Sequence, residues 1–230
     1  MYRGEQSHAG TSHLISYNIS MANIRAFIAI EIPIELQKQL DQLINRLKKQ
    51  ITLRIVRWVP AGNIHVTLKF LGEVAPIQLE SLSQLLINQA GKYSAFNLSV
   101  GGLGAFPSVA KPRVLWVGIQ APPTLAILQK EIENESLQLG FPLEDRGFSP
   151  HLTLARINQN ASFEEIRSVG NSLTASVNSP TNQSLGSFLV GQIHIFRSDL
   201  QPGGAVYTRI GSAPLTGPGH VENRNLPGEA

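Results

Sequence analysis

Residues 64–69 have the sequence Ile-His-Val-Thr-Leu-Lys, and residues 150–155 have the sequence Pro-His-Leu-Thr-Leu-Ala. Each stretch contains His-apolar-Thr-apolar in a strand-like run, and the second lies 86 residues after the first. We call them the first and second HxTx motifs; they comprise His65, Val66, Thr67 and Leu68, and His151, Leu152, Thr153 and Leu154. A single such tetrapeptide is weak evidence, but the pair divides the central part of the chain into two comparable halves and indicates a duplicated unit.

The spacing within each motif suits proton transfer. Side chains alternate along a strand, so His65 and Thr67 share one face while Val66 and Leu68 are buried on the other, and the second motif behaves likewise. Histidine exchanges protons near neutral pH without a large environmental shift. Two facing imidazoles can serve as base and acid on opposite sides of one phosphorus, with the hydroxyls bonded to its oxygens. A lone strand histidine is more often structural, but the repeat favours a functional pair.

The rest of the central sequence predicts strands that alternate with helices. A strand over 25–32 precedes a helix over 33–50, and strands over 54–59 and 64–71 are joined by a turn at 60–63. Further helices are expected over 76–90, 123–139 and 163–170, and further strands over 96–100, 113–119, 151–157, 183–190, 192–196 and 205–210, with a glycine-rich link at 101–107. The short connections favour antiparallel pairing in an α+β fold over a parallel, doubly wound sheet.

Composition excludes several classes of protein. With 42% hydrophobic residues and a net charge of only +3, the chain is neither a disordered protein nor one that coats nucleic acid. The absence of cysteine excludes disulfides and thiolate metal sites, and three widely spaced aspartates argue against a two-metal phosphodiesterase. No apolar run approaches the ~18 residues of a spanning helix. We expect phosphate chemistry by proton transfer, with no metal and no cofactor.

The chain resembles the 2H phosphoesterase superfamily, and within it the RNA 2',3'-cyclic phosphodiesterases, also called 2'-5' RNA ligases. The resemblance covers about residues 22–210. It is carried by the segments 25–29, 57–59, 63–72, 102–107, 112–118 and 148–156, and more loosely by Ser198, Leu200 and Tyr207.

The resemblance implies a bilobal, pseudo-twofold α+β fold in which two antiparallel sheets form a V-shaped cleft with helices outside. It implies metal-independent hydrolysis of a terminal RNA 2',3'-cyclic phosphate to a 2'-phosphate, with His151 as proton acceptor, His65 as proton donor, and Thr67 and Thr153 on the phosphate oxygens. It also implies 2'-5' ligation as a reverse reaction, with an RNA 5'-hydroxyl in place of water and the two histidines exchanging roles.

Two alternatives stay open at this point. One is another 2H activity, on 2'-5' oligonucleotides or small cyclic nucleotides. The other is a non-catalytic module that binds RNA ends. In each case the partner is an RNA 3' end or a related nucleotide, no membrane or obligate protein partner is implied, and we expect a monomer.

Several further residues are candidates for the site. Arg156 suits a phosphate, but simple alternation places it on the face opposite His151 unless the strand bulges. Lys69 has the parity of His65 and is expected at the cleft rim, where it adds positive potential. Phe27, Trp58 and Phe148 can stack on a base, although each suits the core better. His194 lies in an apolar run without a His-x-Thr partner, so we expect a structural histidine.

The polar ends of the chain complete the prediction. Residues 1–21 lack the apolar core of a secretory signal and are expected to be a disordered extension. Residues 211–230 are rich in proline and glycine and are expected to be a disordered tail. The 2H domain is then residues 22–210, and the cytoplasm is the expected location.

Overall fold

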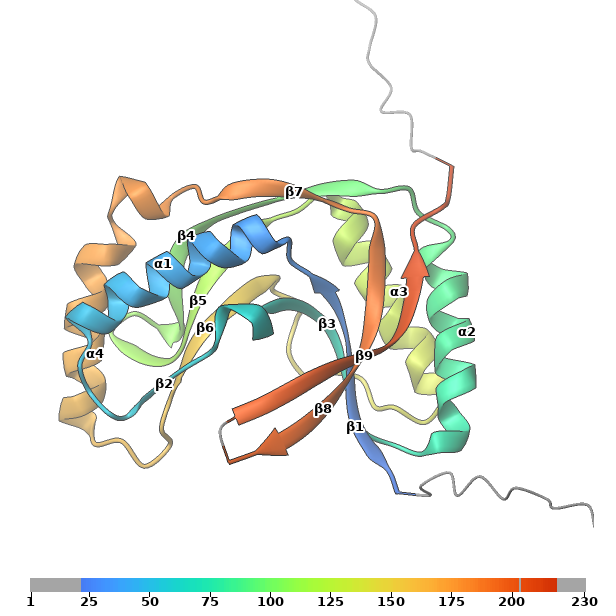
Figure 1. The fold of residues 1–230 in the computed structure, drawn as a ribbon, viewed down its shortest axis with the longest axis horizontal. Coiled ribbons are helices and arrows are strands. Elements are labelled where there is room, and N and C mark those ends of the chain that lie inside the picture. Colours follow the sequence, from blue (N-terminus) through green and yellow to red (C-terminus); the bar gives the residue numbers. More distant parts are fainter. Residues whose placement is uncertain (1–21, 203, 219–230) are drawn as a thin grey trace, which may run out of the picture.

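The computed structural model describes residues 22–202 and 204–218 (Figure 1). The strands are β1 (Ile24–Glu31), β2 (Val56–Trp58), β3 (His65–Val74), β4 (Phe96–Ser108), β5 (Lys111–Gln120), β6 (His151–Ile157), β7 (Gly186–Val190), β8 (Gln192–Gln201) and β9 (Gly204–Pro214). The α-helices are α1 (Ile34–Gln50), α2 (Leu79–Ala90), α3 (Pro123–Gln138) and α4 (Phe163–Val177). The 3-10 turns are η1 (Ala61–Asn63), η2 (Pro76–Gln78) and η3 (Pro180–Asn182).

The strands form two matching groups that meet at the motif strands. Their order is β7-β4-β5-β6-β3-β1-β8-β9, with β2 paired to β6 off this path, and every pairing is antiparallel. Each group therefore has its HxTx strand innermost and three strands beyond it. The predicted antiparallel α+β fold with two lobes is confirmed. The two predicted sheets are continuous, because β3 and β6 pair at the centre.

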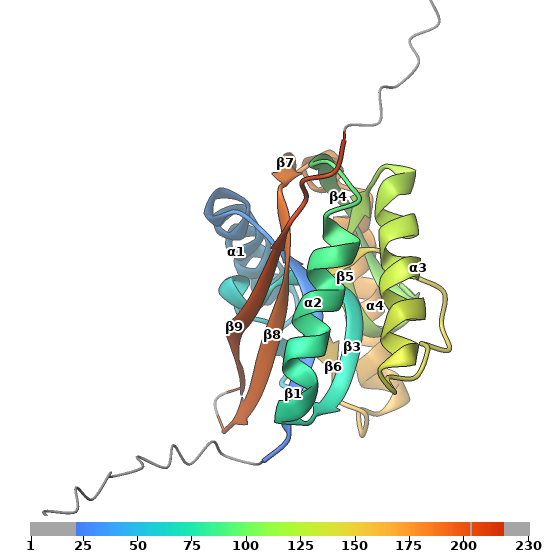
Figure 2. The same cartoon turned by 90° about the vertical axis from the view of Figure 1, so that its right-hand side faces the viewer.

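Helices cover the outside of this curled sheet. Helices α2 and α3 lie side by side, with α2 against β8 and β9 and α3 against β3, whereas α4 packs on β4 and β5 of the other group (Figures 1 and 2). Helix α1 buries Leu36, Leu40, Leu43 and Leu47, the stripe that its helical spacing predicts. Its neighbour Ile44 joins the same buried face. The predicted helix over 33–50 is confirmed.

Three elements differ from the predictions. Strand β2 does not form a hairpin with β3 but pairs with β6. The 3-10 turn η1 connects β2 to β3 along the chain. The glycine-rich stretch 101–107 is not a link but part of the long strand β4, because its glycines admit the neighbouring chain: a Cβ on Gly104 would lie 2.3 Å from the Trp116 ring. Helix α4 continues to Val177, since Leu173 and Ser176 are buried on its inner face.

The predicted domain end at residue 210 is also wrong for the described part of the tail. Strand β9 continues along β8 to Pro214, and Ala213 and Leu215 are buried. Gly217 N then donates to Tyr93 O at 2.9 Å, and Thr216 bridges to Ser94. Residues 211–218 thus belong to the fold because they supply an edge strand and core contacts. The predicted disorder of 1–21 and 219–230 concerns residues outside those that the structure describes.

Candidate active site

The pairing of β3 with β6 brings the two HxTx motifs onto one face. Val66 lies opposite Leu152 in the antiparallel register, which places His65 opposite Thr153 and Thr67 opposite His151. The four polar side chains are partly exposed, whereas the four motif aliphatics, Val66, Leu68, Leu152 and Leu154, are buried on the other face. Two histidines and two hydroxyls therefore alternate around a pseudo-twofold axis that passes between Val66 and Leu152. The face predicted from strand alternation is confirmed.

Both imidazoles are held in the same way. His65 Nδ1 lies 2.9 Å from Asn63 O, and His151 Nδ1 lies 2.7 Å from Ser149 O, so each ring bonds the carbonyl two residues before it. A carbonyl only accepts, so Nδ1 carries the proton in each neutral ring and Nε2 presents its lone pair. This tautomer leaves Nε2 of both histidines available to exchange a proton with a substrate.

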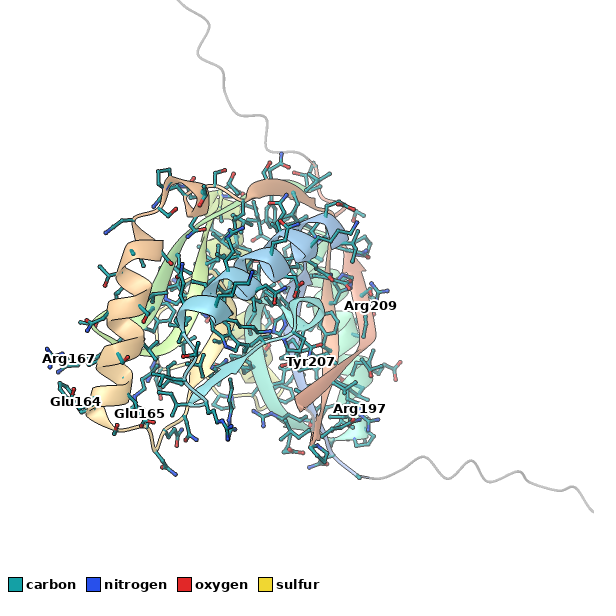
Figure 3. All side chains as sticks on the ribbon, turned by 60° about the vertical axis from the view of Figure 1, so that its left-hand side comes forward. Glu164, Glu165, Arg167, Arg197, Tyr207 and Arg209 are labelled. Atoms are coloured by element: carbon teal, nitrogen blue, oxygen red, sulfur yellow. The ribbon has the colours of Figure 1, made fainter. Side chains whose placement is uncertain are left out.

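The surroundings of the two histidines differ. His65 stacks on Phe27 with ring centroids 4.5 Å apart, and Tyr207 meets it edge-on at 5.3 Å. Figure 3 shows Tyr207 pointing from β9 toward the middle of the molecule. Burial among these rings lowers the pKa of His65 to about 4; the Asn63 carbonyl opposes the shift, and the positive charges of Arg156 and His151 add to it. His65 is therefore neutral at pH 7 in the unliganded protein.

Each motif has a bulge at its last residue. In the β1–β3 pairing Ile28 is opposite Lys69 and Ala29 opposite Thr67, so Leu68 has no partner. In the β5–β6 pairing Leu154 is skipped in the same way, since Leu115 is opposite Ala155 and Trp116 opposite Thr153. An extra residue reverses the facing of every side chain after it. The two residues after each motif, Lys69 and Phe70 in β3 and Ala155 and Arg156 in β6, thus point to the opposite face from the one that alternation predicts.

The first bulge overturns the prediction for Lys69. Its side chain is not at the cleft rim but inside the protein with 0% exposure, where Nζ lies 2.7 Å from Glu133 Oε2 on α3. Lys69 also donates to Pro142 O, and Gln129 Nε2 lies 3.4 Å from the second carboxylate oxygen, Oε1. The bulge at Leu68 turns the Lys69 ammonium away from the motif face and into the core. A charge can be buried in the core when it is paired and hydrogen-bonded, as this ammonium is.

The second bulge turns Arg156 toward the site. Arg156 lines a cavity of about 470 Å³ together with His65, Thr67 and Thr153. Simple alternation placed Arg156 on the opposite face unless the strand bulges, and the strand does bulge. The residue equivalent to Arg156 in the first lobe is Phe70, which lines the same cavity and is 52% exposed. Sequence reasoning missed Phe70, and the repeat itself was the available signal, since both residues stand five positions after their histidine.

The cavity gathers residues from distant parts of the chain. Arg25, Phe27, Ser198, Leu200 and Tyr207, which carried part of the resemblance, all line it. His151 does not line it, although its register and its influence on the pKa of His65 place it beside the cavity.

The other aromatic and histidine candidates are buried or half-buried. Phe27 is 4% exposed and stacks on His65, so it is part of the wall and not an open platform for a base. Phe148 and Trp58 are half-buried and pack against the core, although Trp58 also lines a neighbouring cavity. His194 is buried, with Nδ1 2.9 Å from Ser212 Oγ, as expected for a structural histidine.

Two features are absent from the part of the chain that the structure describes. No group of three or more His, Cys, Asp or Glu side chains in residues 22–202 and 204–218 is placed to hold a metal ion. None of the helices that the structure describes is long and apolar enough to cross a membrane.

Comparison with known proteins gives consistent results. The family described as "LigT like Phosphoesterase" matches the chain twice, over residues 30–116 and 117–207, with one HxTx motif in each match. A protein of Methanothermobacter thermautotrophicus named RNA 2',3'-cyclic phosphodiesterase is 30% identical over 185 residues, which are 80% of this chain and 95% of that protein. A protein of the same name from Thermotoga maritima is 34% identical over 134 residues, which are 58% of this chain and 70% of that one.

Solved structures show the same relationship. A protein of Thermus thermophilus, TT0787, superposes with a TM-score of 0.68 at 27% identity, covering 84% of this chain and 99% of that one. Escherichia coli LigT complexed with 3'-AMP superposes with a TM-score of 0.64 at 26% identity and the same coverage. The duplicated halves, the fold and the sequence therefore all point to one family.

Proposed function

The chain belongs to the LigT-like phosphoesterases, and on that premise we propose that it hydrolyses the 2',3'-cyclic phosphate at an RNA 3' end to a 2'-phosphomonoester. The observation that carries the proposal is the Val66–Leu152 register, which sets each motif histidine opposite the other motif's threonine. The names of the relatives supply the substrate class. The two Nε2 atoms supply groups suited to taking a proton from one side of a phosphorus and giving one to the other.

The proposed step uses both histidines. His151 Nε2 takes a proton from water as the water oxygen bonds to phosphorus, and His65 Nε2 gives a proton to the 3'-oxygen as its bond to phosphorus breaks. The Thr67 and Thr153 hydroxyls and the Arg156 guanidinium bind the non-bridging oxygens, where charge builds up. The products are a 2'-phosphate and a free 3'-hydroxyl, and the two histidines then exchange their protons with solvent.

The low pKa of His65 fits this role only when substrate is bound. A histidine with a pKa of about 4 carries no donatable proton on Nε2 at pH 7. An anionic cyclic phosphate beside it favours the imidazolium, so substrate binding would be accompanied by proton uptake. His65 would thereby become an acid at the moment when the 3'-oxygen requires one.

The balance of atoms changes what we expect of ligation. When an RNA 5'-hydroxyl replaces water, it attacks the same phosphorus and expels the same 3'-oxygen, which leaves a 2'-5' linkage. His151 remains the acceptor and His65 the donor. The exchange of roles expected above belongs instead to the reverse reaction, in which the 3'-hydroxyl attacks a 2'-5' linkage and the 5'-oxygen departs. Ligation is a second proposal on the same groups.

The test is turnover, in the presence of chelator, of an oligoribonucleotide that ends in a 2',3'-cyclic phosphate. We expect a 2'-phosphate product from the wild type and from Arg167→Gln, a control on the outer side of α4 (Figure 3). His65→Ala and His151→Ala should lose at least about a hundredfold in rate, since each removes one proton-transfer group. Strict dependence on an added divalent ion, or undiminished turnover in both variants, contradicts the proposal.

Other outcomes separate the alternatives. Binding of RNA ends without turnover would favour the non-catalytic module, and turnover confined to 2'-5' oligonucleotides or small cyclic nucleotides would favour another 2H activity. The expected monomeric state and cytoplasmic location stay predictions.

A further inference from the structure

A second cavity of about 520 Å³ adjoins the candidate active site. The two cavities share five lining residues, Val59, Asn63, Arg156, Ala205 and Tyr207, so they lie directly beside each other. The shared residues come from the η1 region, β6 and β9, and Asn63 Nδ2 donates to Ala205 O at 2.7 Å across the boundary. A ligand longer than one nucleotide therefore has room to extend from the motif histidines into the second cavity.

The second cavity carries positive charge without an acidic partner. Arg57 and Arg156 line it, and none of its described lining residues is Asp or Glu. Among the described residues, neither guanidinium forms an ion pair. The other polar side chains in its wall include the amides of Asn158 and Asn160, which can donate to phosphate or sugar oxygens.

The two arginines lie close together by register. Arg57 on β2 is opposite Arg156 on β6, so their side chains leave the same face of neighbouring strands. Like charges in directly opposite positions destabilise a sheet unless something compensates them. An anion lying over the two strands would supply that compensation. Arg156 also lines the catalytic cavity, whereas Arg57 is the arginine that lines the second cavity alone.

We propose that Arg57 binds the phosphodiester that precedes the terminal nucleotide, so that the protein favours an oligoribonucleotide over a mononucleotide cyclic phosphate. The inference rests on the proposed function, because it assumes that the terminal cyclic phosphate occupies the motif site. A contact to the phosphate backbone carries no sequence information, so the preference is for chain length and not for a particular base.

The experiment compares two substrates. One is a short oligoribonucleotide ending in a 2',3'-cyclic phosphate, and the other is adenosine 2',3'-cyclic monophosphate, which lacks the preceding phosphodiester. Arg57→Gln should lower kcat/KM about tenfold or more for the oligonucleotide and leave the mononucleotide unchanged, since hydrogen bonds to charged groups are strong. The slope of log kcat/KM against log salt for the oligonucleotide should fall by about 0.7.

Two controls make the result specific. Arg54 is an exposed arginine three residues before Arg57, and it lines neither cavity. Arg54→Gln should therefore leave kcat/KM unchanged for both substrates. An oligonucleotide with a neutral methylphosphonate at the linkage before the terminal nucleotide should react as slowly with wild type as with Arg57→Gln.

The outcomes that overturn the inference are distinct from those that overturn the proposed function. An equal effect of Arg57→Gln on both substrates, no effect on either, or an equal effect of Arg54→Gln refutes the Arg57 contact while the hydrolase survives. If the wild type turns over neither substrate, the proposed function is refuted and the inference loses its basis.

Discussion

The buried pair between Lys69 and Glu133 anchors the first motif strand to α3, and its removal should be costly. Lys69 lies just beyond the bulge at Leu68, its side chain is fully buried, and its Nζ is 2.7 Å from Glu133 Oε2. Coulomb's law at an effective dielectric constant of 20 gives about 6 kcal/mol of attraction at that distance. Because surroundings and water relax when one partner is lost, breaking such a pair costs about 3–5 kcal/mol.

Glu133→Gln should therefore lower the free energy of unfolding by about 3 kcal/mol, the lower end of that range, because the amide oxygen still accepts from Lys69. Lys69→Met should cost a similar amount, since it leaves the carboxylate buried and unpaired. The double variant should cost less than the sum of the two by about 3 kcal/mol, because no unpaired charge remains.

Urea unfolding of the wild type, the two single variants and the double variant measures this coupling. Lys92→Met is the matched control. Lys92 pairs with Glu131, which lies on α3 as Glu133 does, but both side chains are solvent-exposed, so we expect a cost within about 1 kcal/mol. A cost below about 1 kcal/mol for Glu133→Gln, or a coupling near zero, would show that the pair does not hold the strand. Lys92→Met costing as much as Glu133→Gln would also refute the reasoning.

Two further predictions concern stability. The pKa of His65 is about 4 in the folded protein, against an ordinary value of 6.5. As pH falls, the imidazole of His65 is therefore protonated in the unfolded chain before it is protonated in the folded protein. His65 therefore contributes stability above pH 6.5 that is lost between 6.5 and 4, about 3 kcal/mol in all, and His65→Gln should remove that part of the pH dependence in urea titrations. Parallel curves for variant and wild type would contradict this. Gly104→Ala places a Cβ 2.3 Å from Trp116 Cη2 and should destabilise by about 1–3 kcal/mol, whereas Gly147→Ala, whose Cβ meets nothing within 4 Å, should change stability by less than about 1 kcal/mol in the same assay. Equal effects of the two substitutions would show that the ring moves aside freely.

The sequence was sufficient to predict features that depend on local periodicity. The alternation of His65, Val66, Thr67 and Leu68 specifies which side chains share a face, and the repeat specifies a second copy of that face. The apolar spacing of α1 specifies its buried stripe in the same way. These features do not depend on which strand or helix packs against them, so they can be predicted from the local sequence alone.

The features that the sequence did not predict depend on the partner. The bulge at Leu68 reflects how β3 fits against β1, and it inverts Lys69, whose acidic partner Glu133 lies 64 residues away. The extension of β9 to Pro214 depends on pairing with β8, which its proline- and glycine-rich composition does not reveal. Packing against distant strands thus outweighs local pattern at these positions.

The matched bulges also have a consequence for the orientation of a substrate. Because each lobe breaks its alternation at the same point, Phe70 and Arg156 occupy corresponding places, yet one presents an apolar ring and the other a cation. The two motif histidines are the same residue type in both lobes, as are the two motif threonines, whereas Phe70 and Arg156 differ. In the proposed reaction, a phosphorus between the histidines would therefore have surroundings that are not symmetric, with Phe70 from one lobe and Arg156 from the other. One divergent position beyond each copy is enough to make a symmetric frame directional, so that a nucleoside attached to one side of the phosphorus meets different chemistry from a nucleoside attached to the other.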